Sequence, residues 1–275
     1  MQISLERHLP ADAQPPYRRY LAPVSALLGL ALFLSIPMPL SEKAHAFLHG
    51  ICAQRPSHTL AFGNGLLPFD ARMTGIYSGF LAAFVALIAT GRHRRAGLPT
   101  LLSGMVLLLL LGSMALDGFN SLFTDLRLPA LYTPHNRLRL LTGMGAGVGL
   151  ATMLTMLIGM TFWRRPRVRD HVISRWWEPV ALYLAGLPLL ILMMTGWSPL
   201  LAPATLLLVT AAVFAFGGLA SVSFLLVTGK ENRFDTVAEA QGSMVLGGVI
   251  GVVVIALLAL GRFAFEGWTN VPPLT

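Results

Sequence analysis

The segment HAFLHGICAQRPSHTL, residues 45–60, gathers side chains that can bind metal ions or transfer protons. It holds three histidines and Cys52, the one cysteine of the chain. If the segment is helical, His45, His49 and Cys52 share one face, because residues three and four apart are neighbours on a helix. Imidazole and thiolate are ligands of zinc and copper. His49, Cys52 and His58 are therefore weak metal candidates, but their spacing follows no established ligand pattern and no metal is assigned.

The segment FDARMTGIYSGF, residues 69–80, offers groups that bind anions or cap a helix. Asp70 belongs to the residue types that cap helix starts. Arg72 stands at the edge of an apolar span, where a guanidinium either reaches toward water or holds a carboxylate or phosphate through two hydrogen bonds. Gly75 and Gly79 form a small-xxx-small strip that suits close helix packing. Both a cap with packing and an anion site are compatible with this segment.

The segment LDGFNSLF, residues 116–123, ends an apolar run with an ionisable group. Asp117 is expected at or just inside the membrane boundary, where such a group is paired or faces water and indicates function. The alternative is a turn that ends the helix, because Asp-Gly is a frequent turn pair. Asn120 adds amide donors and an acceptor nearby. We favour the functional interpretation of Asp117.

The segment YTPHNRLRLLTGMGAGVG, residues 132–149, begins another span. Arg137 and Arg139 are two residues apart, so they point about 200° apart on a helix and cannot both serve one site. Of the polar residues in this segment, we assign Asn136 and Arg137 to a predicted ligand-binding cluster, which is described below. The glycines of this span give two small-xxx-small faces for tight helix contact. A dinucleotide-binding fingerprint is excluded, because no strand precedes these glycines.

Composition identifies the elements that must position these groups as membrane-spanning helices. The 275 residues are 55% hydrophobic and 12% charged, against about 25% charged in soluble domains. Several apolar runs reach the ~20 residues needed to cross a ~30 Å hydrocarbon core. The net charge of +8 comes from arginine clusters between the spans, which is a topology signal and does not indicate a nucleic-acid partner. The expected fold is all-α, a polytopic transmembrane bundle forming one membrane domain over residues 1–275.

The apolar lengths predict seven spans, and the first is expected to remain uncleaved. They cover residues 20–40, 74–91, 98–116, 138–162, 177–195, 199–228 and 240–262. Of the 20 Lys and Arg, thirteen fall on the side of the N-terminus and seven on the opposite side. The positive-inside rule then places the N-terminus in the cytoplasm. We expect a multi-pass protein of the inner membrane, whose bilayer is its first partner.

The opposite, extracytoplasmic side carries the polar chemistry, in two loops at residues 41–73 and 117–137. The predicted ligand-binding cluster consists of His49, Cys52, Gln54, Arg55, His58, Asp70, Arg72, Tyr77, Asp117, Asn136 and Arg137. Six of the seven cations on this side lie in or beside these loops. One face of the protein thus carries topology signals and the other carries candidate functional groups.

Together these motifs resemble those of a widespread bacterial family of predicted integral-membrane proteins of unknown function. The resemblance covers about residues 45–150 and leaves residues 176–263 as a C-terminal three-span extension. The family's central motif is C-A-R-C-T-G-I-Y-x-G, and this chain has Asp70 and Met73 at the two cysteine positions. If relatives use those cysteines for a thiolate site or a disulfide, this protein lacks it. The matching residues are His49, Cys52, residues 54–58, residues 68–80, Leu116, Asp117, Gly118, Asn136, Arg137, Arg139, Thr142 and Gly143.

Three functions are compatible with the sequence. In the first, the cluster binds a small anion, a lipid head group or a metal. In the second, the protein is an accessory subunit that contacts other membrane subunits through small-residue helix faces. The cluster is then a structural plug held together by hydrogen bonds. A hydrolase or transferase ranks lowest. Asp70 and Asp117 are its one obvious carboxylate pair, and the chain has no G-x-S-x-G, H-E-x-x-H, P-loop or C-x-x-C motif. An enzymatic role is therefore left open but not favoured, and no cofactor is identified.

Overall fold

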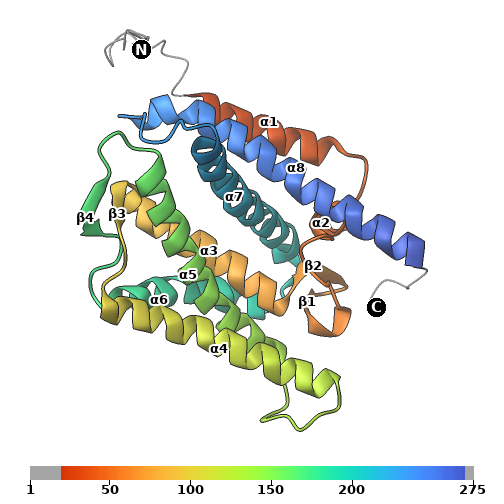
Figure 1. The fold of residues 1–275 in the computed structure, drawn as a ribbon. Helices are drawn as coiled ribbons and strands as arrows, with labels where there is room; N and C mark the ends of the chain where they lie inside the picture. Colours follow the sequence, from red (N-terminus) through yellow and green to blue (C-terminus); the bar gives the residue numbers. More distant parts are fainter. Residues whose placement is uncertain (1–19, 270–275) are drawn as a thin grey trace.

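The computed structural model describes residues 20–269, in which long helices lie side by side (Figure 1). Arg7, Arg18 and Arg19, which enter the charge count above, lie outside the described residues. The helices are α1 (Leu21–Ser35), α2 (Leu40–Leu48), α3 (Ala71–Ala89), α4 (Leu101–Asp125), α5 (Asn136–Thr161), α6 (Trp177–Met194), α7 (Leu201–Val227) and α8 (Val237–Thr269). The strands are β1 (Thr59–Phe62), β2 (Gly65–Asp70), β3 (Arg95–Gly97) and β4 (Arg167–His171).

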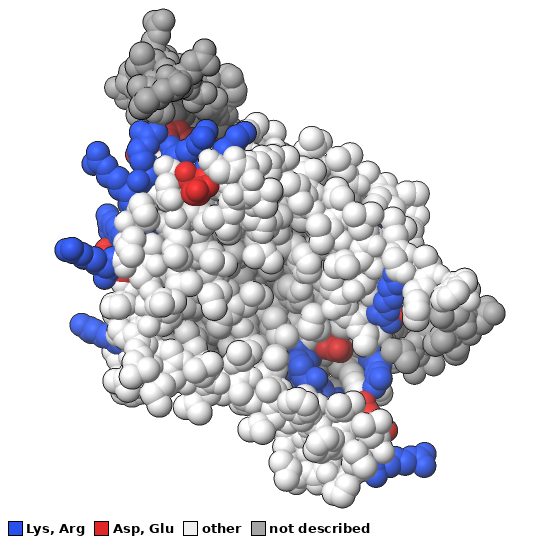
Figure 2. Space-filling view, viewed as in Figure 1, with Lys and Arg blue, Asp and Glu red and all other residues white. Residues whose placement is uncertain are grey.

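The predicted all-α membrane fold is confirmed. Six helices are long and apolar enough to cross a membrane, and α1 with α2 makes a seventh if that bent pair counts as one span. On the face viewed in Figure 2, charged side chains gather at two opposite ends, and a wide band between them carries none. Such a band is what a hydrocarbon environment requires, because unpaired charges in it are costly.

The predicted first span, residues 20–40, is helical only to Ser35, where α1 ends, and the axis of the following α2 differs from that of α1 by 112°. Pro37 and Pro39 stand at the break, and a proline cannot donate the backbone hydrogen bond that would continue a helix. Lys43 on α2 turns back to the end of α1. Its Nζ donates to the carbonyls of Phe33, Leu34 and Ile36 at 3.1, 2.9 and 3.2 Å. The lysine thereby satisfies carbonyls that the end of α1 leaves without helical partners.

The third predicted span ends at residue 116, and the structure corrects this boundary. Helix α4 runs through Asp117 and Gly118 to Asp125. The alternative interpretation of Asp-Gly as a turn that ends the helix is therefore wrong. Asp117, Asn120, Ser121 and Thr124 are spaced three and four apart and lie along one side of the helix. Likewise, the predicted loop 41–73 contains α2 and an antiparallel hairpin of β1 and β2.

The glycine strips predicted for close packing lie between α3 and α5. A Cβ on Gly75 would collide with the Leu140 carbonyl oxygen, and one on Gly147 would collide with the Ile76 carbonyl oxygen. A Cβ on Gly79 would lie 2.6 Å from the Met144 carbonyl oxygen. Only residues without a side chain allow two helix backbones to approach so closely. This contact brings together the ends of α3 and α5 that carry the candidate arginines.

Helices α7 and α8 pack through glycines in the same way, at Gly217, Gly247 and Gly251. The sequence predicted that small-residue faces on the fourth and seventh spans contact partner proteins. In the structure these faces pack largely against other helices of the same chain. Helix α5 is the central helix, with 67% of its apolar window buried, whereas α4 has 11%. Most of the surface of α4 therefore faces away from the rest of the protein.

Candidate functional site

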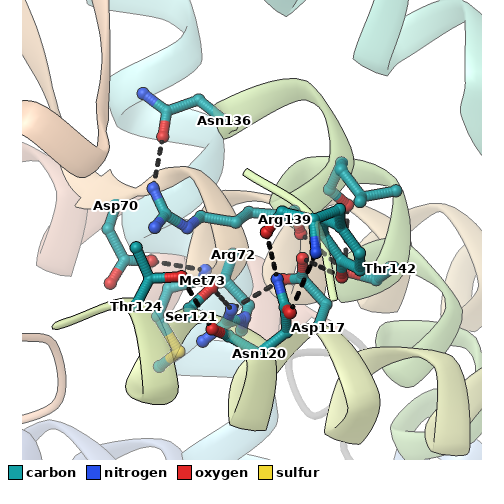
Figure 3. A network of polar contacts seen from close by, with 12 residues as sticks. Asp70, Arg72, Met73, Asp117, Asn120, Ser121, Thr124, Asn136, Arg139 and Thr142 are labelled. Carbon is teal, nitrogen blue, oxygen red and sulfur yellow. Dashed lines mark hydrogen bonds and ion pairs between the residues drawn. The ribbon is translucent and has the colours of Figure 1, made fainter. Parts of the chain in front are cut away.

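An ion pair between α3 and α4 lies at the centre of the site (Figure 3). Asp70 caps α3, its Oδ1 accepting the Met73 N–H at 2.9 Å, and this fixes Arg72 in the first turn. Arg72 Nη2 donates to Asp117 Oδ2 at 2.6 Å and to Ser121 Oγ at 3.2 Å. The Asp117 side chain is 1% exposed and that of Arg72 is 26% exposed. A buried carboxylate is therefore held by a guanidinium that still reaches solvent.

The loop between α4 and α5 folds back over this pair. Tyr132 Oη donates to Asp117 Oδ1 at 3.0 Å, so both carboxylate oxygens are occupied. Asn120 holds the loop in place, because its Nδ2 donates to the Tyr132 carbonyl at 2.8 Å and its Oδ1 accepts the Leu131 N–H at 2.7 Å. Burial, and then the hydrogen bond to Asp117, raise the pKa of Tyr132. The tyrosine is consequently a neutral donor over the whole physiological pH range.

A second guanidinium, Arg139 on α5, completes the site, although the sequence prediction selected Arg137. Arg139 is 7% exposed, and its Nη1 donates to Asn136 Oδ1 at 2.9 Å. Asn136 Nδ2 in turn donates to the Ser57 carbonyl at 3.2 Å. Arg137 is exposed on the other side of α5, as the angle between residues two apart on a helix requires. The assignment of Arg137 to the cluster is therefore corrected to Arg139.

A signal for this choice was present in the sequence. Arg139 stands four residues before Gly143 and eight before Gly147, so it continues the strip that packs against α3. On the facing helix, Arg72 stands three residues before Gly75 and seven before Gly79, a spacing that also keeps it near the glycine strip. The sequence interpretation treated packing and chemistry as separate features of these segments.

The two guanidinium groups of the site are incompletely paired. Arg139 feels the like charge of Arg72 and the opposite charges of Asp117, Asp125 and Asp70. Among residues 20–269, however, Arg139 forms no ion pair, and Arg72 pairs with Asp117 alone. Arg72 Nε is buried and has no hydrogen-bond partner within the described chain, which is unfavourable by roughly 1–3 kcal/mol for a buried donor. The site can thus accept a further negatively charged acceptor.

We define the arginine cluster as two hydrogen-bonded groups whose charges interact: Arg72, Asp117, Asn120, Ser121 and Tyr132 in one, and Asn136 and Arg139 in the other. At its rim, Arg55 Nη1 and Asp125 Oδ2 form a half-exposed ion pair at 2.8 Å. Burial, and then the charge of Arg139, lower the pKa of His58, so this rim imidazole is neutral at pH 7. Figure 2 shows charged side chains of both signs bordering a hollow at the lower right end of the molecule.

Other predicted site residues lie in a separate group. His49 ring nitrogens contact Gln54 Oε1 at 3.0 Å and Glu266 Oε2 at 2.8 Å. Glu266 also accepts from Arg262 Nε at 2.8 Å. The sequence interpretation missed Arg262 and Glu266 because it ended the last span at residue 262, although Arg and Glu four residues apart are typical of a continuing helix. Tyr77, also predicted for the site, instead stacks on Phe69 in the core, with ring centroids 4.7 Å apart.

Cys52 is buried, and its Sγ accepts the N–H groups of Gln54 and Asp70 at 3.4 Å each. Burial, and then the charge of Asp70, raise the pKa of the Cys52 thiol to about 12. A thiol in this state is a poor metal ligand and a poor nucleophile. Within residues 20–269 no group of three or more His, Cys, Asp or Glu is arranged to hold a metal ion, so His49, Cys52 and His58 do not come together as one site.

Comparisons with known proteins find relatives for the part of the chain that holds the arginine cluster. Residues 52–153 match the family described as predicted membrane protein, DUF2085; the matched part includes the whole arginine cluster and ends before α6. An uncharacterized protein from the archaeon Methanothermobacter thermautotrophicus is 32% identical over 108 residues, which are 39% of this chain and 86% of that protein. No solved structure matches the chain. The chain therefore belongs to the DUF2085 family of predicted membrane proteins.

Proposed function

We propose that the arginine cluster binds an anion at the extracytoplasmic face of an inner-membrane protein. The observation that carries the proposal is the imbalance between donors and acceptors. Among the described residues Arg139 forms no ion pair, Arg72 pairs with Asp117 alone, and the buried Arg72 Nε has no acceptor. An anion between the two guanidinium groups would supply the missing acceptor.

The donors favour an oxyanion of the carboxylate or phosphate type. A guanidinium presents its N–H groups in a planar fork that matches two oxygens of such a group. Of the three ligand classes predicted from sequence, a small anion or a lipid head group suits this chemistry, whereas two cationic side chains repel a metal ion. The position of the cluster near one end of the helices, with Arg72 partly exposed, is compatible with access from water or from the head-group region.

Thermal unfolding of the purified protein tests this proposal. Inorganic phosphate and phosphatidylglycerol, added separately, are expected to raise the Tm of the wild type, because a ligand that binds only the folded state stabilises it by about 2.7 kcal/mol at one hundred times its Kd. Arg139→Gln should abolish the shift. Arg137→Gln is the matched control, since it removes the same charge from the exposed side of the same helix. Equal shifts in both variants would disprove binding at the cluster.

The alternative function, an accessory subunit of a larger membrane assembly, has one feature in its favour. Helix α1 contains no buried residue, and only 11% of the apolar window of α4 is buried, so both helices present long apolar faces to lipid or to a partner. In this case the arginine cluster is a structural plug. Native mass spectrometry after gentle extraction distinguishes the two functions, since a stoichiometric partner protein supports the subunit and a bound lipid or anion supports the site.

A further inference from the structure

The arginine cluster lies directly beside apolar surface, and α4 carries both. Asp117, Asn120 and Ser121 on this helix are buried. Leu116 and Phe119, which stand close to them in the sequence, are exposed. Because each residue of an α-helix is turned by about 100° from the one before it, the two groups lie on different sides of the same turns. The polar site is thus one helix width away from the surface that the bilayer covers.

The loop that follows α4 continues the apolar surface beyond the end of the helix. Leu126, Leu128 and Leu131 are exposed in it, and Leu131 is 85% exposed. The loop is held against the cluster, because Asn120 Oδ1 accepts the Leu131 N–H at 2.7 Å. Large apolar side chains exposed together mark surfaces that meet a membrane or a partner. In a membrane protein this loop suits the head-group region, which sets the cluster at the depth of the lipid phosphates.

A glycine on α4 leaves the guanidinium group of Arg72 uncovered on this side. Gly118 follows Asp117 and is half-buried. A Cβ at Gly118 would lie 3.8 Å from Arg72 Nη1 and 4.0 Å from Arg72 Cζ, with no other atom within 4 Å. A side chain here would therefore cover the guanidinium without displacing its neighbours. The hollow in Figure 2 lies where Figure 1 places the start of α3 beside the last turns of α4.

We propose that the anion bound by the arginine cluster is the phosphodiester of an anionic phospholipid, whose acyl chains lie on the exposed side of α4. This inference rests on the proposed function and names the ligand of the same site. The head group would occupy the hollow, and the glycerol and acyl chains would pass Gly118 to reach the apolar surface.

The donors of the cluster match this ligand. A phosphodiester carries one negative charge on two unesterified oxygens, which fit the planar fork of a guanidinium group. The buried Arg72 Nε lacks an acceptor, and the Arg139 guanidinium donates only to Asn136 among residues 20–269. A head group that also contains an ammonium group is disfavoured, because two arginines repel it. The lipid is therefore of the phosphatidylglycerol type.

The surroundings favour a lipid over free phosphate. Apolar side chains border the cluster on the α4 side and on the loop, and a free ion makes no use of them. A phospholipid in the bilayer already holds its phosphate at the depth of the cluster and its chains against α4. Its single charge is also repelled less by Asp117 than the second charge of inorganic phosphate would be.

Lipid retention tests the inference on the full chain. The protein is reconstituted into phosphatidylcholine vesicles that contain a minor fraction of phosphatidylglycerol, extracted gently and analysed by native mass spectrometry. The wild type should retain phosphatidylglycerol at least about ten-fold in excess of its share of the vesicle, the factor that one charge-assisted hydrogen bond gives. Arg139→Gln should lose this enrichment, because it removes one of the two guanidinium groups.

Gly118→Leu is the second variant, and it should also lose the enrichment, because its side chain covers Arg72 on the lipid side. Gly112→Leu is the matched control, since a Cβ at Gly112 on the same helix meets no atom within 4 Å, and it should retain lipid as the wild type does. Leucine has a higher helix propensity than glycine. Both variants should therefore unfold at or above the wild-type temperature, which separates loss of binding from loss of fold.

The outcomes distinguish this inference from the function on which it rests. Absence of enrichment in the wild type overturns the lipid, and anion binding still stands if inorganic phosphate stabilises the wild type but not Arg139→Gln. Enrichment that survives Arg139→Gln places the lipid elsewhere and overturns the inference. Enrichment that survives Gly118→Leu overturns the path along α4. Anion binding itself fails if neither phosphate nor phosphatidylglycerol distinguishes the wild type from Arg139→Gln.

Discussion

Asp117 carries one negative charge between donors from two other segments of the chain. Arg72 binds one of its oxygens, at 2.6 Å, and Tyr132 binds the other, at 3.0 Å. With 1% of its side chain exposed, this carboxylate has no water to replace those donors. At this scale the site depends on a single charge that orients a helix, a loop and a guanidinium together.

Replacing Asp117 by Asn should destabilise the protein by about 2–3 kcal/mol. The loss is set below the 3–5 kcal/mol of a fully buried pair, because Arg72 remains partly exposed and water can solvate it. Asp125→Asn, which breaks the half-exposed pair with Arg55, should cost at most about 1 kcal/mol. Unfolding titrations in detergent measure both. A cost for Asp125→Asn equal to that for Asp117→Asn would contradict the central role of the buried carboxylate.

At the scale of helices, the contact between α3 and α5 determines the geometry of the site. Gly143 lies against the Arg72 backbone, and Gly147 lies against that of Ile76. Because Arg139 continues the same strip, shortening the distance between the two helices also brings the two guanidinium groups together. The contact therefore positions charges that would repel each other in isolation, with Asp117 as the counter-charge.

Gly147→Ala should lower the free energy of unfolding by about 1–3 kcal/mol or more, because the added methyl group meets backbone that cannot move aside. Gly149→Ala, two residues later on α5, meets no atom within 4 Å. It should leave stability unchanged or raise it by up to about 1 kcal/mol, the helix-propensity difference between alanine and glycine. The same detergent titration compares them. Equal effects of the two substitutions would show that the α3–α5 contact is not tight.

The sequence predicted those features that depend on residues close together in one segment of the chain. Apolar length predicted the spans to within a few residues at most ends, and glycine spacing predicted the close packing. The rotation of each helix about its axis was not predicted, and this is why Arg137 was selected in place of Arg139. The extension of α4 past Asp117 was missed because Asp-Gly favours a turn locally, whereas the pair with Arg72 stabilises the helix through tertiary contact.

At the scale of the whole molecule, the residues predicted to form one polar cluster lie in two separate groups. The arginine cluster joins α3, α4 and α5, whereas His49 bonds to Glu266 on α8, 217 positions away in the sequence. No local pattern relates residues so distant, so the sequence grouped His49 with Asp117 only because both lie on the same predicted side. Charged side chains nevertheless gather at two ends of the molecule, as the distribution of arginines predicted (Figure 2).

The orientation of these two ends in the membrane is the last prediction. Asn64, exposed in the turn between β1 and β2, and Arg169, exposed in β4, lie in connections separated by an odd number of spans. If the N-terminus is cytoplasmic, a membrane-impermeant maleimide should label Asn64→Cys in intact cells and Arg169→Cys only after permeabilisation. The native thiol gives little background, because at pH 7 a buried cysteine with a pKa of about 12 is almost entirely protonated. Labelling of both variants from one side would contradict the seven-span topology, and the reversed pattern would place the arginine cluster on the cytoplasmic face.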